Sequence, residues 1–291
     1  MRVAVASGKG GTGKTLVSTS LAWLLARAGH PVAYVDADVE EPNGHLFLHP
    51  ELLGRQRYAR PVPELVRKTC SGCGECQSFC QFNAIVALPD RIMLFPELCS
   101  SCGGCVLACR EMALREKPRE IGSIETGTAW TGNRQPIRFM AATLDVGEAR
   151  ATPLIRGLLG RIEDPGIVLI DAPPGTSCSV MEIVREADRV VLVTEPTPFG
   201  LHDLALAVEM VRAVGVPCGV IINRSTAADA ETLRYCSAQG LEILARLPDE
   251  RRIAEAYSRG ELAAQAIPEY RRLFESLLRE IEAVAGQEST S

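Results

Sequence analysis

The stretch Gly8-Lys9-Gly10-Gly11-Thr12-Gly13-Lys14-Thr15 decides the fold of this chain. It fits the pattern G-x-x-x-x-G-K-[ST], follows the strand-like run Met1–Ser7 and precedes the helical pattern Leu16–Ala28. Glycines let backbone N–H groups approach phosphate oxygens, and a helix N-terminus adds a favourable dipole. Lys14 adds positive charge, and the Thr15 hydroxyl can bind Mg²⁺. We therefore expect the whole stretch to bind the phosphates of a nucleotide.

Strand-like and helical segments alternate through most of the chain. Further strands are expected at Pro31–Asp36, Ile167–Asp171, Val190–Thr194 and Val216–Asn223. Helical patterns are expected at Thr176–Glu186, Leu201–Val214 and Ala227–Gln239. This alternation predicts an α/β fold with a doubly wound and mostly parallel sheet. Together with the phosphate-loop pattern, it resembles the fold of the P-loop NTPases. A C-terminal helix is expected to dock on the core through Leu273, Phe274, Leu277, Leu278, Ile281 and Val284.

Composition narrows the classes of function. No N-terminal stretch is typical of a signal peptide, and no apolar run reaches the roughly 20 residues that span a bilayer. We expect a cytoplasmic protein with no stable membrane insertion. A net charge of −5 argues against nucleic acid as a partner. Thiols of an unsecreted protein stay reduced, so the 11 cysteines predict metal or cluster ligation in preference to disulfides.

Eight of the 11 cysteines lie between Arg60 and Pro118, where the alternation of strands and helices stops. They form two runs of identical spacing, Cys70-x2-Cys73-x2-Cys76-x3-Cys80 and Cys99-x2-Cys102-x2-Cys105-x3-Cys109. The two runs align as an internal repeat with an offset of 29 residues. We expect an inserted domain over residues 60–118, with the ATPase domain divided into residues 1–59 and 119–291.

This repeat resembles a bacterial ferredoxin that binds two [4Fe–4S] clusters, an α+β unit. In such runs the fourth cysteine ligates the other cluster. The expected ligand sets are Cys70, Cys73, Cys76 and Cys109 for one cluster and Cys80, Cys99, Cys102 and Cys105 for the other. Gln81 and Arg110 replace the proline that usually follows, which leaves an extra N–H free to bond a sulfur. Zinc is the competing metal, but its structural sites favour separate C-x2-C pairs.

Lys9 adds a second lysine to the phosphate loop, which an ordinary P-loop does not require. The loop therefore resembles the deviant Walker A motif of the MinD, ParA and nitrogenase iron protein class. The resemblance implies a nucleotide-dependent homodimer in which Lys9 acts on the partner's nucleotide, as an arginine finger does elsewhere. The segment Asp36–Asn43 is similar to switch I of Mrp and Nbp-type relatives, which implies that Asp38 positions the attacking water and Asp36 helps organise Mg²⁺. Paired acids after a strand could instead cap a helix.

The segment Asp171–Thr176 resembles Walker B and switch II of the same class. By this resemblance Asp171 reaches the magnesium through water and Gly175 contacts the γ-phosphate. Asn223 matches the position that recognises adenine, although an asparagine at a strand end is also an ordinary turn residue. Pro248 matches the loop that lines the base. The expected catalytic residues are Lys9, Lys14, Asp38 and Asp171, with Mg²⁺ held at Thr15, Asp36 and Asp171.

The remaining cysteines and the histidine pair carry weaker signals. Cys178 lies at the offset of a cluster-bridging cysteine of the nitrogenase iron protein, but no second such cysteine is found. It is otherwise expected to be a small buried residue, as are Cys218 and Cys236. His45 and His49 have i, i+4 spacing without a third ligand nearby, so we expect surface histidines.

Three functions follow from the combination of ATPase and ferredoxin. The first is an ATPase that couples ATP to electron transfer through two [4Fe–4S] clusters. The second is a carrier that delivers clusters or metal to an apoprotein, as Mrp relatives do, and the absence of a labile C-x-x-C pair argues against it. The third is a nucleotide-switched regulatory module with redox-sensing clusters. The partner is accordingly a redox protein or an apoprotein.

Overall fold

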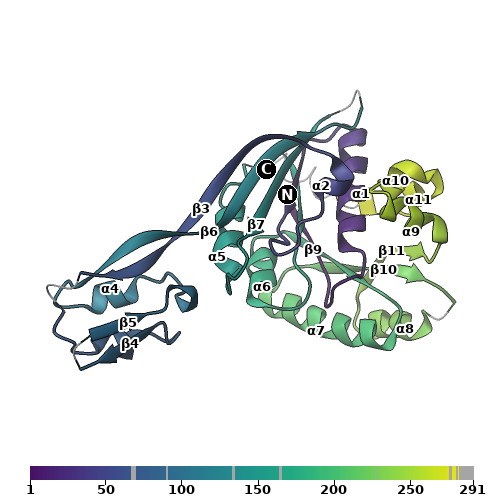
Figure 1. Cartoon of the computed structure of the whole chain (residues 1–291). Helices are drawn as coiled ribbons and strands as arrows, with labels where there is room; N and C mark the ends of the chain where they lie inside the picture. The colour runs from purple at the N-terminus through teal and green to yellow at the C-terminus, as the bar shows by residue number, and fades with distance from the viewer. Residues whose placement is uncertain are drawn as a thin grey trace, which may run out of the picture.

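The protein has a large body and a small unit at the end of a long two-stranded arm (Figure 1). The computed structural model describes residues 1–66, 70–89, 91–132, 135–163, 166–227, 229–274, 277–279 and 281. Within these residues no helix is both long enough and apolar enough to cross a membrane.

The body is built on a sheet of nine strands in the described part of the chain, in the order β11-β10-β9-β1-β8-β2-β7-β6-β3. Neighbours from β11 to β7 are parallel, and β6 and β3 join the edge antiparallel. The predicted α/β fold with a mostly parallel sheet is confirmed. The strands are β1 Arg2–Ala6, β2 Val32–Asp36, β3 Glu51–Leu65, β6 Leu114–Ala129, β7 Ile137–Leu144, β8 Ile167–Asp171, β9 Arg189–Thr194, β10 Cys218–Ser225 and β11 Glu242–Pro248.

Helices cover both faces of this sheet, so its central strands are buried on two sides and consist largely of Val, Ile and Leu. One hydrophobic core receives α1, α2, α9, α10 and α11, and the other receives α5, α6, α7 and α8. The helices are α1 Lys14–Ala28, α2 His45–Leu48, α5 Thr152–Leu159, α6 Cys178–Arg185, α7 Pro198–Val214, α8 Ala230–Ala238, α9 Arg251–Ser258, α10 Ala263–Ala266 and α11 Pro268–Arg272.

The expected docking of the C-terminal segment is confirmed for Phe274, Leu277 and Ile281, which are buried in the first core. Leu273 and Leu278 pack against that core and are partly buried. Val284 lies outside the described residues.

The arm consists of β3 and β6, which pair antiparallel from Glu51 opposite Thr128 to Leu65 opposite Leu114. The predicted domain boundaries fall inside these two strands, where Pro61 lies opposite Pro118. Most of β3 is exposed, so it lacks the apolar alternation that marks a strand in sequence. The small unit contains α3 Glu75–Phe79, β4 Ile85–Leu88, β5 Arg91–Leu94, the 3₁₀ turn η1 Pro96–Leu98 and α4 Gly104–Ala108.

The two cysteine runs have matching backbones. Gly74 and Gly103 are left-handed, with φ of 78° and 69°, and each precedes a five-residue helix. Left-handed residues also recur at Asn83 and Met112, again 29 residues apart. A left-handed backbone at non-glycine residues is uncommon, so its recurrence at one offset indicates that the sequence repeat is also a structural repeat.

Candidate functional site

The phosphate loop runs between the end of β1 at Ala6 and the start of α1 at Lys14. A Cβ atom on Gly8 would lie 2.2 Å from the carbonyl oxygen of Asp203 on α7, and one on Gly13 would lie 2.3 Å from the Asn223 side-chain nitrogen. Gly13 is also left-handed, with φ of 94°. Only glycine permits these close approaches, and they place the loop against the carboxyl ends of the central strands.

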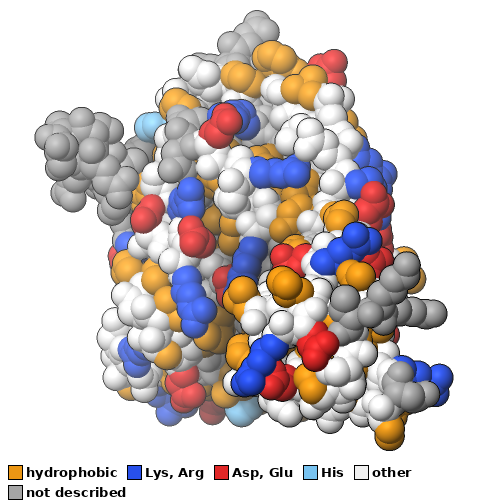
Figure 2. Space-filling view, turned by 90° about the vertical axis from the view of Figure 1, so that its left-hand side faces the viewer, with side chains coloured by type: hydrophobic (Ala, Val, Ile, Leu, Met, Phe, Trp, Pro, Cys, Tyr) orange, Lys and Arg blue, Asp and Glu red, His pale blue; other side chains and the backbone are white. Residues whose placement is uncertain are grey.

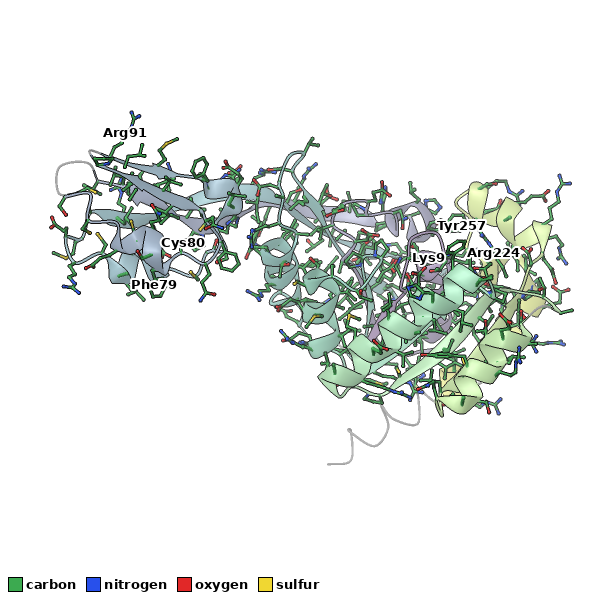
Figure 3. The ribbon with its side chains drawn as sticks, turned by 90° about the horizontal axis from the view of Figure 1, so that it is seen from below. Lys9, Phe79, Cys80, Arg91, Arg224 and Tyr257 are labelled. Carbon is green, nitrogen blue, oxygen red and sulfur yellow. The ribbon has the colours of Figure 1, made fainter. Side chains whose placement is uncertain are left out.

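A cavity of about 410 Å³ opens over this loop. The structure brings several predicted residues to its wall, namely Gly10, Gly11, Gly13, Lys14, Thr15, Asp38, Asn223 and Pro248. The other predicted residues, namely Gly8, Lys9, Thr12, Asp36, Asp171 and Gly175, are not among its lining residues, although Pro174 is. Arg224 and Tyr257 also line the cavity, although no motif in the sequence marked either residue. Figure 3 labels both of them, with Lys9, in the body of the protein.

Two buried aspartates lie side by side at the ends of the neighbouring strands β2 and β8. Asp36 ends β2 and faces Asp171 at the end of β8, and neither is more than 1% exposed. Burial raises the pKa of both carboxyl groups, and the charge of Asp171 raises the pKa of Asp36 further. Burial also raises the pKa of Asp38 to about 6, against the lowering effect of Lys14.

The Asp171 carboxylate has one oxygen in use. The Tyr34 hydroxyl donates to its Oδ2 at 3.0 Å, whereas Oδ1 is buried without a hydrogen-bond partner among the described residues. Burial and the two carboxylates raise the pKa of Tyr34 well above its usual value, so the hydroxyl stays a donor. Paired buried carboxylates with an orphaned oxygen fit Mg²⁺, which prefers oxygen ligands. The residues present therefore suit this ion.

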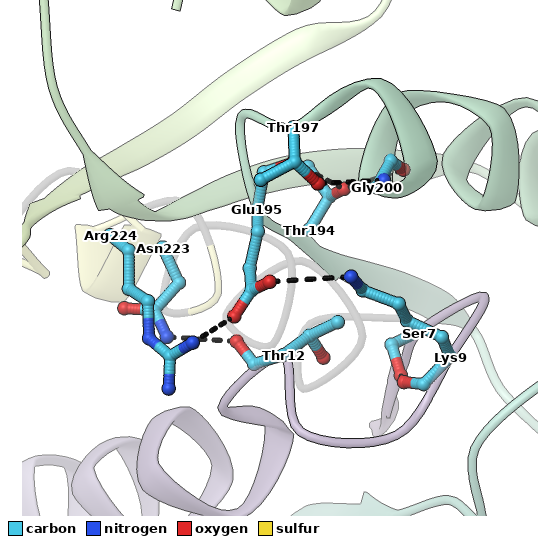
Figure 4. Close-up of polar contacts among 9 residues, drawn as sticks. All are labelled: Ser7, Lys9, Thr12, Thr194, Glu195, Thr197, Gly200, Asn223 and Arg224. Carbon is cyan, nitrogen blue, oxygen red and sulfur yellow. Dashed lines mark hydrogen bonds and ion pairs between the residues drawn. The ribbon is translucent and has the colours of Figure 1, made fainter.

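Lys9 takes part in an ion-pair network at the side of the loop (Figure 4). Its Nζ lies 3.3 Å from Glu195 Oε2, and Arg224 Nη1 lies 2.6 Å from Glu195 Oε1. The side chain of Glu195 is 10% exposed and follows the last residue of β9. Its place at the carboxyl end of a parallel strand was the one sequence signal that could have marked it.

Asn223 is clamped to the phosphate loop. Its side-chain Nδ2 donates to the Thr12 carbonyl oxygen at 2.8 Å, and the residue is 6% exposed. The recognition of adenine by Asn223 and Pro248 stays a prediction. The Gly175 N–H donates to the Ser7 carbonyl at 2.9 Å, which ties the loop after β8 to the phosphate loop.

The remaining expectations on cysteines and histidines have mixed outcomes. Cys178 is exposed at the first residue of α6, so its expected burial is wrong, because the end of this helix faces outward at the site. Cys236 is buried as expected, and Cys218 is only partly buried. His45 and His49 are surface residues, as predicted.

The small unit contains two cysteine-lined cavities. The larger, of about 470 Å³, is lined by Cys80, Cys99, Cys102 and Cys105. The smaller, of about 20 Å³, is lined by Cys70, Cys73, Cys76 and Cys109. Each cavity thus receives three cysteines of one run and the fourth of the other. Among the described residues no three His, Cys, Asp or Glu side chains form a group that could hold a single metal ion.

Backbone N–H groups point at two of these sulfurs. The Ser101 N–H donates to Cys99 Sγ and the Ala113 N–H to Cys109 Sγ, each at 3.3 Å. Such bonds stabilise thiolates that ligate iron. Burial raises the pKa of the Cys105 thiol to about 11 and raises the pKa of Cys76. Four thiols around one cavity, with N–H groups directed at sulfur, fit a multi-iron group.

A buried arginine joins the larger cavity to the body. Arg60 is 2% exposed, and its guanidinium donates to the carbonyl oxygens of Pro96, at 2.9 Å, and of Cys99. It also lies 3.7 Å from Glu148, whose side chain is 5% exposed, in the segment between β7 and α5. In the same segment Arg150 lies 4.6 Å from the centre of the Phe82 ring. Nothing in the sequence marked Arg60, because its partners are distant along the chain.

Replacing Arg60 with methionine is expected to lower the free energy of unfolding by about 3 kcal/mol, because it leaves the carbonyl oxygens of Pro96 and Cys99 without their donor and leaves Glu148 with Arg119 alone. Arg55→Met removes a partly exposed ion pair with Glu125 and a hydrogen bond to Ser123, and should cost about 1 kcal/mol. Urea denaturation of both variants measures the difference. Equal small losses would contradict the structural role of Arg60.

The chain belongs to the family described as the CobQ/CobB/MinD/ParA nucleotide binding domain, whose sequence model matches residues 3–263. Two uncharacterized proteins of Methanocaldococcus jannaschii are similar. One is 27% identical over 270 residues, which cover 90% of each chain, and the other is 30% identical over 232 residues, which cover 77% of this chain and 78% of the relative.

Iron–sulfur cluster carrier proteins are also similar to this chain. The one from Pyrococcus horikoshii is 24% identical over 316 residues, which cover 99% of this chain and 90% of the relative. Among solved structures, the septum site-determining protein MinD of the same organism, complexed with Mg-ADP, has a TM-score of 0.60 at 20% identity. That match covers 98% of this chain and 97% of the other. The fold is therefore shared with MinD.

Proposed function

We propose that this chain is a Mg²⁺-dependent ATPase that binds iron–sulfur clusters in its small unit and uses ATP to control their delivery to another protein. The observation that carries cluster binding is the pair of cavities, each lined by three cysteines of one run and the fourth of the other. Relatives named as iron–sulfur cluster carriers, which match nearly the full chain, support delivery as the purpose.

The small unit is the ferredoxin-like part of this proposal. Cys70, Cys73, Cys76 and Cys109 would hold one [4Fe–4S] cluster, and Cys80, Cys99, Cys102 and Cys105 would hold the other. The structural repeat and the N–H groups directed at sulfur support it. Bound iron would supply positive charge that stabilises the thiolate form, which burial otherwise disfavours.

ATP would bind in the cavity over the phosphate loop. Backbone N–H groups of Gly8–Thr15 and the Lys14 ammonium would hold the phosphates, and Asn223 keeps the loop in place through Thr12. Asp38, on the cavity wall, would orient the attacking water and accept its proton. Thr15, Asp36 and Asp171 would hold Mg²⁺, which neutralises charge on the phosphates when bound.

Dimerisation would complete this site. Lys14 of the same chain lines the cavity, whereas Lys9 pairs with Glu195 and does not line it, so in this proposal a second chain supplies the additional lysine at the phosphates. The nucleotide would lie between two copies, and Lys9 would exchange Glu195 for the partner's phosphates.

Glu195→Gln is expected to tighten ATP-dependent dimerisation by about two- to fivefold, because a partly exposed ion pair contributes up to about 1 kcal/mol that Lys9 must give up. Sedimentation with a non-hydrolysable ATP analogue measures the change. Glu261→Gln, which alters an exposed pair with Arg259, is the control and should leave the dimer unchanged. A weaker dimer in Glu195→Gln alone would mean that Glu195 does not restrain Lys9.

Electron transfer through the two clusters is the second candidate function. It is favoured by the completeness of each four-thiol set, since the interleaved runs would hold both clusters permanently. Exposed apolar side chains on the small unit, such as Leu107 at 87% and Met112 at 82%, suit contact with a protein partner in either case. Figure 2 shows charges of both signs between hydrophobic side chains on the face that lies toward the end of the arm.

Cluster transfer separates the two candidates. Reconstituted protein is mixed anaerobically with an apoferredoxin, and iron in each protein is measured after separation, with Mg-ATP, with Mg-ADP or without nucleotide. Delivery predicts that iron moves to the acceptor faster with Mg-ATP. Iron that stays in place while reducing equivalents pass to the acceptor would favour electron transfer and overturn delivery.

A further inference from the structure

Tyr34 is a buried polar residue that no motif explains. It lies in the middle of β2, in the sequence Val32-Ala33-Tyr34-Val35, and is 0% exposed. A phenol in the interior needs a hydrogen-bond partner, and the hydroxyl of Tyr34 has two neighbours there. It donates to Asp171 Oδ2 at 3.0 Å and lies 3.4 Å from Ser18 Oγ on α1.

The ring is held in one place. It stacks on Phe139 with centroids 5.9 Å apart, and a Cβ on Gly44 would lie 2.5 Å from its hydroxyl oxygen. These contacts fix the ring, with its hydroxyl oxygen between Asp171 Oδ2 and Ser18 Oγ. Because Oδ2 accepts this bond, the orientation of the carboxylate is fixed and Oδ1 is the oxygen left without a hydrogen bond among the described residues.

Tyr34 also touches the segment that carries Asp38. The Gly44 N–H donates to Asp36 Oδ2 at 2.8 Å, and the Asp38 N–H donates to Asp36 Oδ1 at 3.3 Å. Gly44 thus packs against Tyr34 and donates a hydrogen bond to Asp36. Tyr34 therefore contacts two parts of the site: Asp171 at the end of β8, through a hydrogen bond, and Gly44 in the loop after β2, through packing.

We propose that Tyr34 is a positioning residue for Mg²⁺-dependent hydrolysis: its hydroxyl orients Asp171 so that Oδ1 faces the ion, and its ring seats the Asp38 segment at Gly44. This inference rests on the proposed ATPase function. Phenylalanine at this position would keep the packing on Phe139 and remove only the hydroxyl.

The test compares Tyr34→Phe with Tyr270→Phe. Tyr270 is 2% exposed, and its hydroxyl has no hydrogen-bond partner among the described residues, so its variant makes the same chemical change without a lost bond. For each protein we would measure kcat, KM, the Mg²⁺ concentration at half-maximal rate, the ADP affinity with and without Mg²⁺, and the urea midpoint.

Tyr34→Phe is expected to lower kcat about tenfold and to raise the half-maximal Mg²⁺ concentration several-fold, as loss of a buried hydrogen bond to a charged group predicts. Its ADP affinity without Mg²⁺ and its KM should match wild type, and Tyr270→Phe should change none of these. Equal behaviour of the two variants, or a loss of metal-free ADP affinity in Tyr34→Phe, would overturn the positioning role.

The ADP measurements keep this inference separate from the proposed function. If wild type binds ADP more tightly with Mg²⁺ yet hydrolyses no ATP, the ATPase proposal fails. The increase in ADP affinity that Mg²⁺ causes, the Mg²⁺ enhancement, can still be compared between wild type and Tyr34→Phe, and it decides whether Tyr34 orients Asp171. An undiminished enhancement would overturn the inference, and a wild type without any Mg²⁺ enhancement would overturn both.

Discussion

Lys9→Ala is expected to abolish ATP hydrolysis, with kcat lowered about 10³-fold or more, the loss seen when a transition-state cation is removed from a phosphoryl-transfer site. Nucleotide affinity of the isolated chain should change little, because Lys9 pairs with Glu195 and does not line the cavity. Steady-state phosphate release and ADP titration measure the two effects. Lys117→Ala, which removes an exposed lysine of the arm, is the control.

Mixed dimers test whether Lys9 acts on the partner's nucleotide. Lys9→Ala keeps the phosphate-binding Lys14, and Lys14→Ala keeps Lys9, so a dimer of one chain of each variant contains one complete site. Mixing the two inactive proteins should restore part of the activity. No recovery, while sedimentation shows that mixed dimers form, would contradict action across the dimer.

Loss of a single cysteine has the second large expected effect. Cys99→Ala should lower the iron content from about eight to about four atoms per chain, because one four-iron cluster loses a ligand while the other keeps its four. Metal analysis of anaerobically purified protein measures the loss. Cys218→Ala, outside the small unit, is the control and should keep all the iron.

Cys80 distinguishes interleaved from separate ligand sets. It belongs to the first run in sequence but lines the cavity of Cys99, Cys102 and Cys105. Cys80→Ala should therefore give the electron paramagnetic resonance spectrum of Cys99→Ala and differ from Cys73→Ala. A spectrum like that of Cys73→Ala would mean that each run binds its own cluster, and zinc in place of iron would overturn the ferredoxin-like proposal.

Local patterns predicted much of the fold. The strand Ile167–Asp171 was predicted with its observed bounds, and the helix after the phosphate loop within two residues of its start. Buried parallel strands and amphipathic helices carry their signals in neighbouring residues. The arm has no such pattern of neighbouring residues. Most of β3 is exposed and several of its residues are charged, so it lacks the apolar pattern of a core strand.

The candidate sites likewise contain residues that a local motif marked and residues that no motif marked. Spacing within the chain marked the phosphate loop and the cysteine runs, which the structure gathers around three cavities in its described part. Glu195, Arg60 and Tyr34 were missed because their contacts join residues far apart in sequence. Each is a polar group whose role depends on a partner that only the folded chain supplies.

Electron paramagnetic resonance with iron quantitation, on anaerobically purified and dithionite-reduced protein with and without Mg-ATP, tests the coupling of nucleotide to clusters most directly. We expect about eight irons per chain and a spectrum that changes when Mg-ATP is added. Eight irons with a spectrum that does not change when Mg-ATP is added would contradict the coupling of nucleotide to clusters. A chain that binds no iron would contradict the cluster sites.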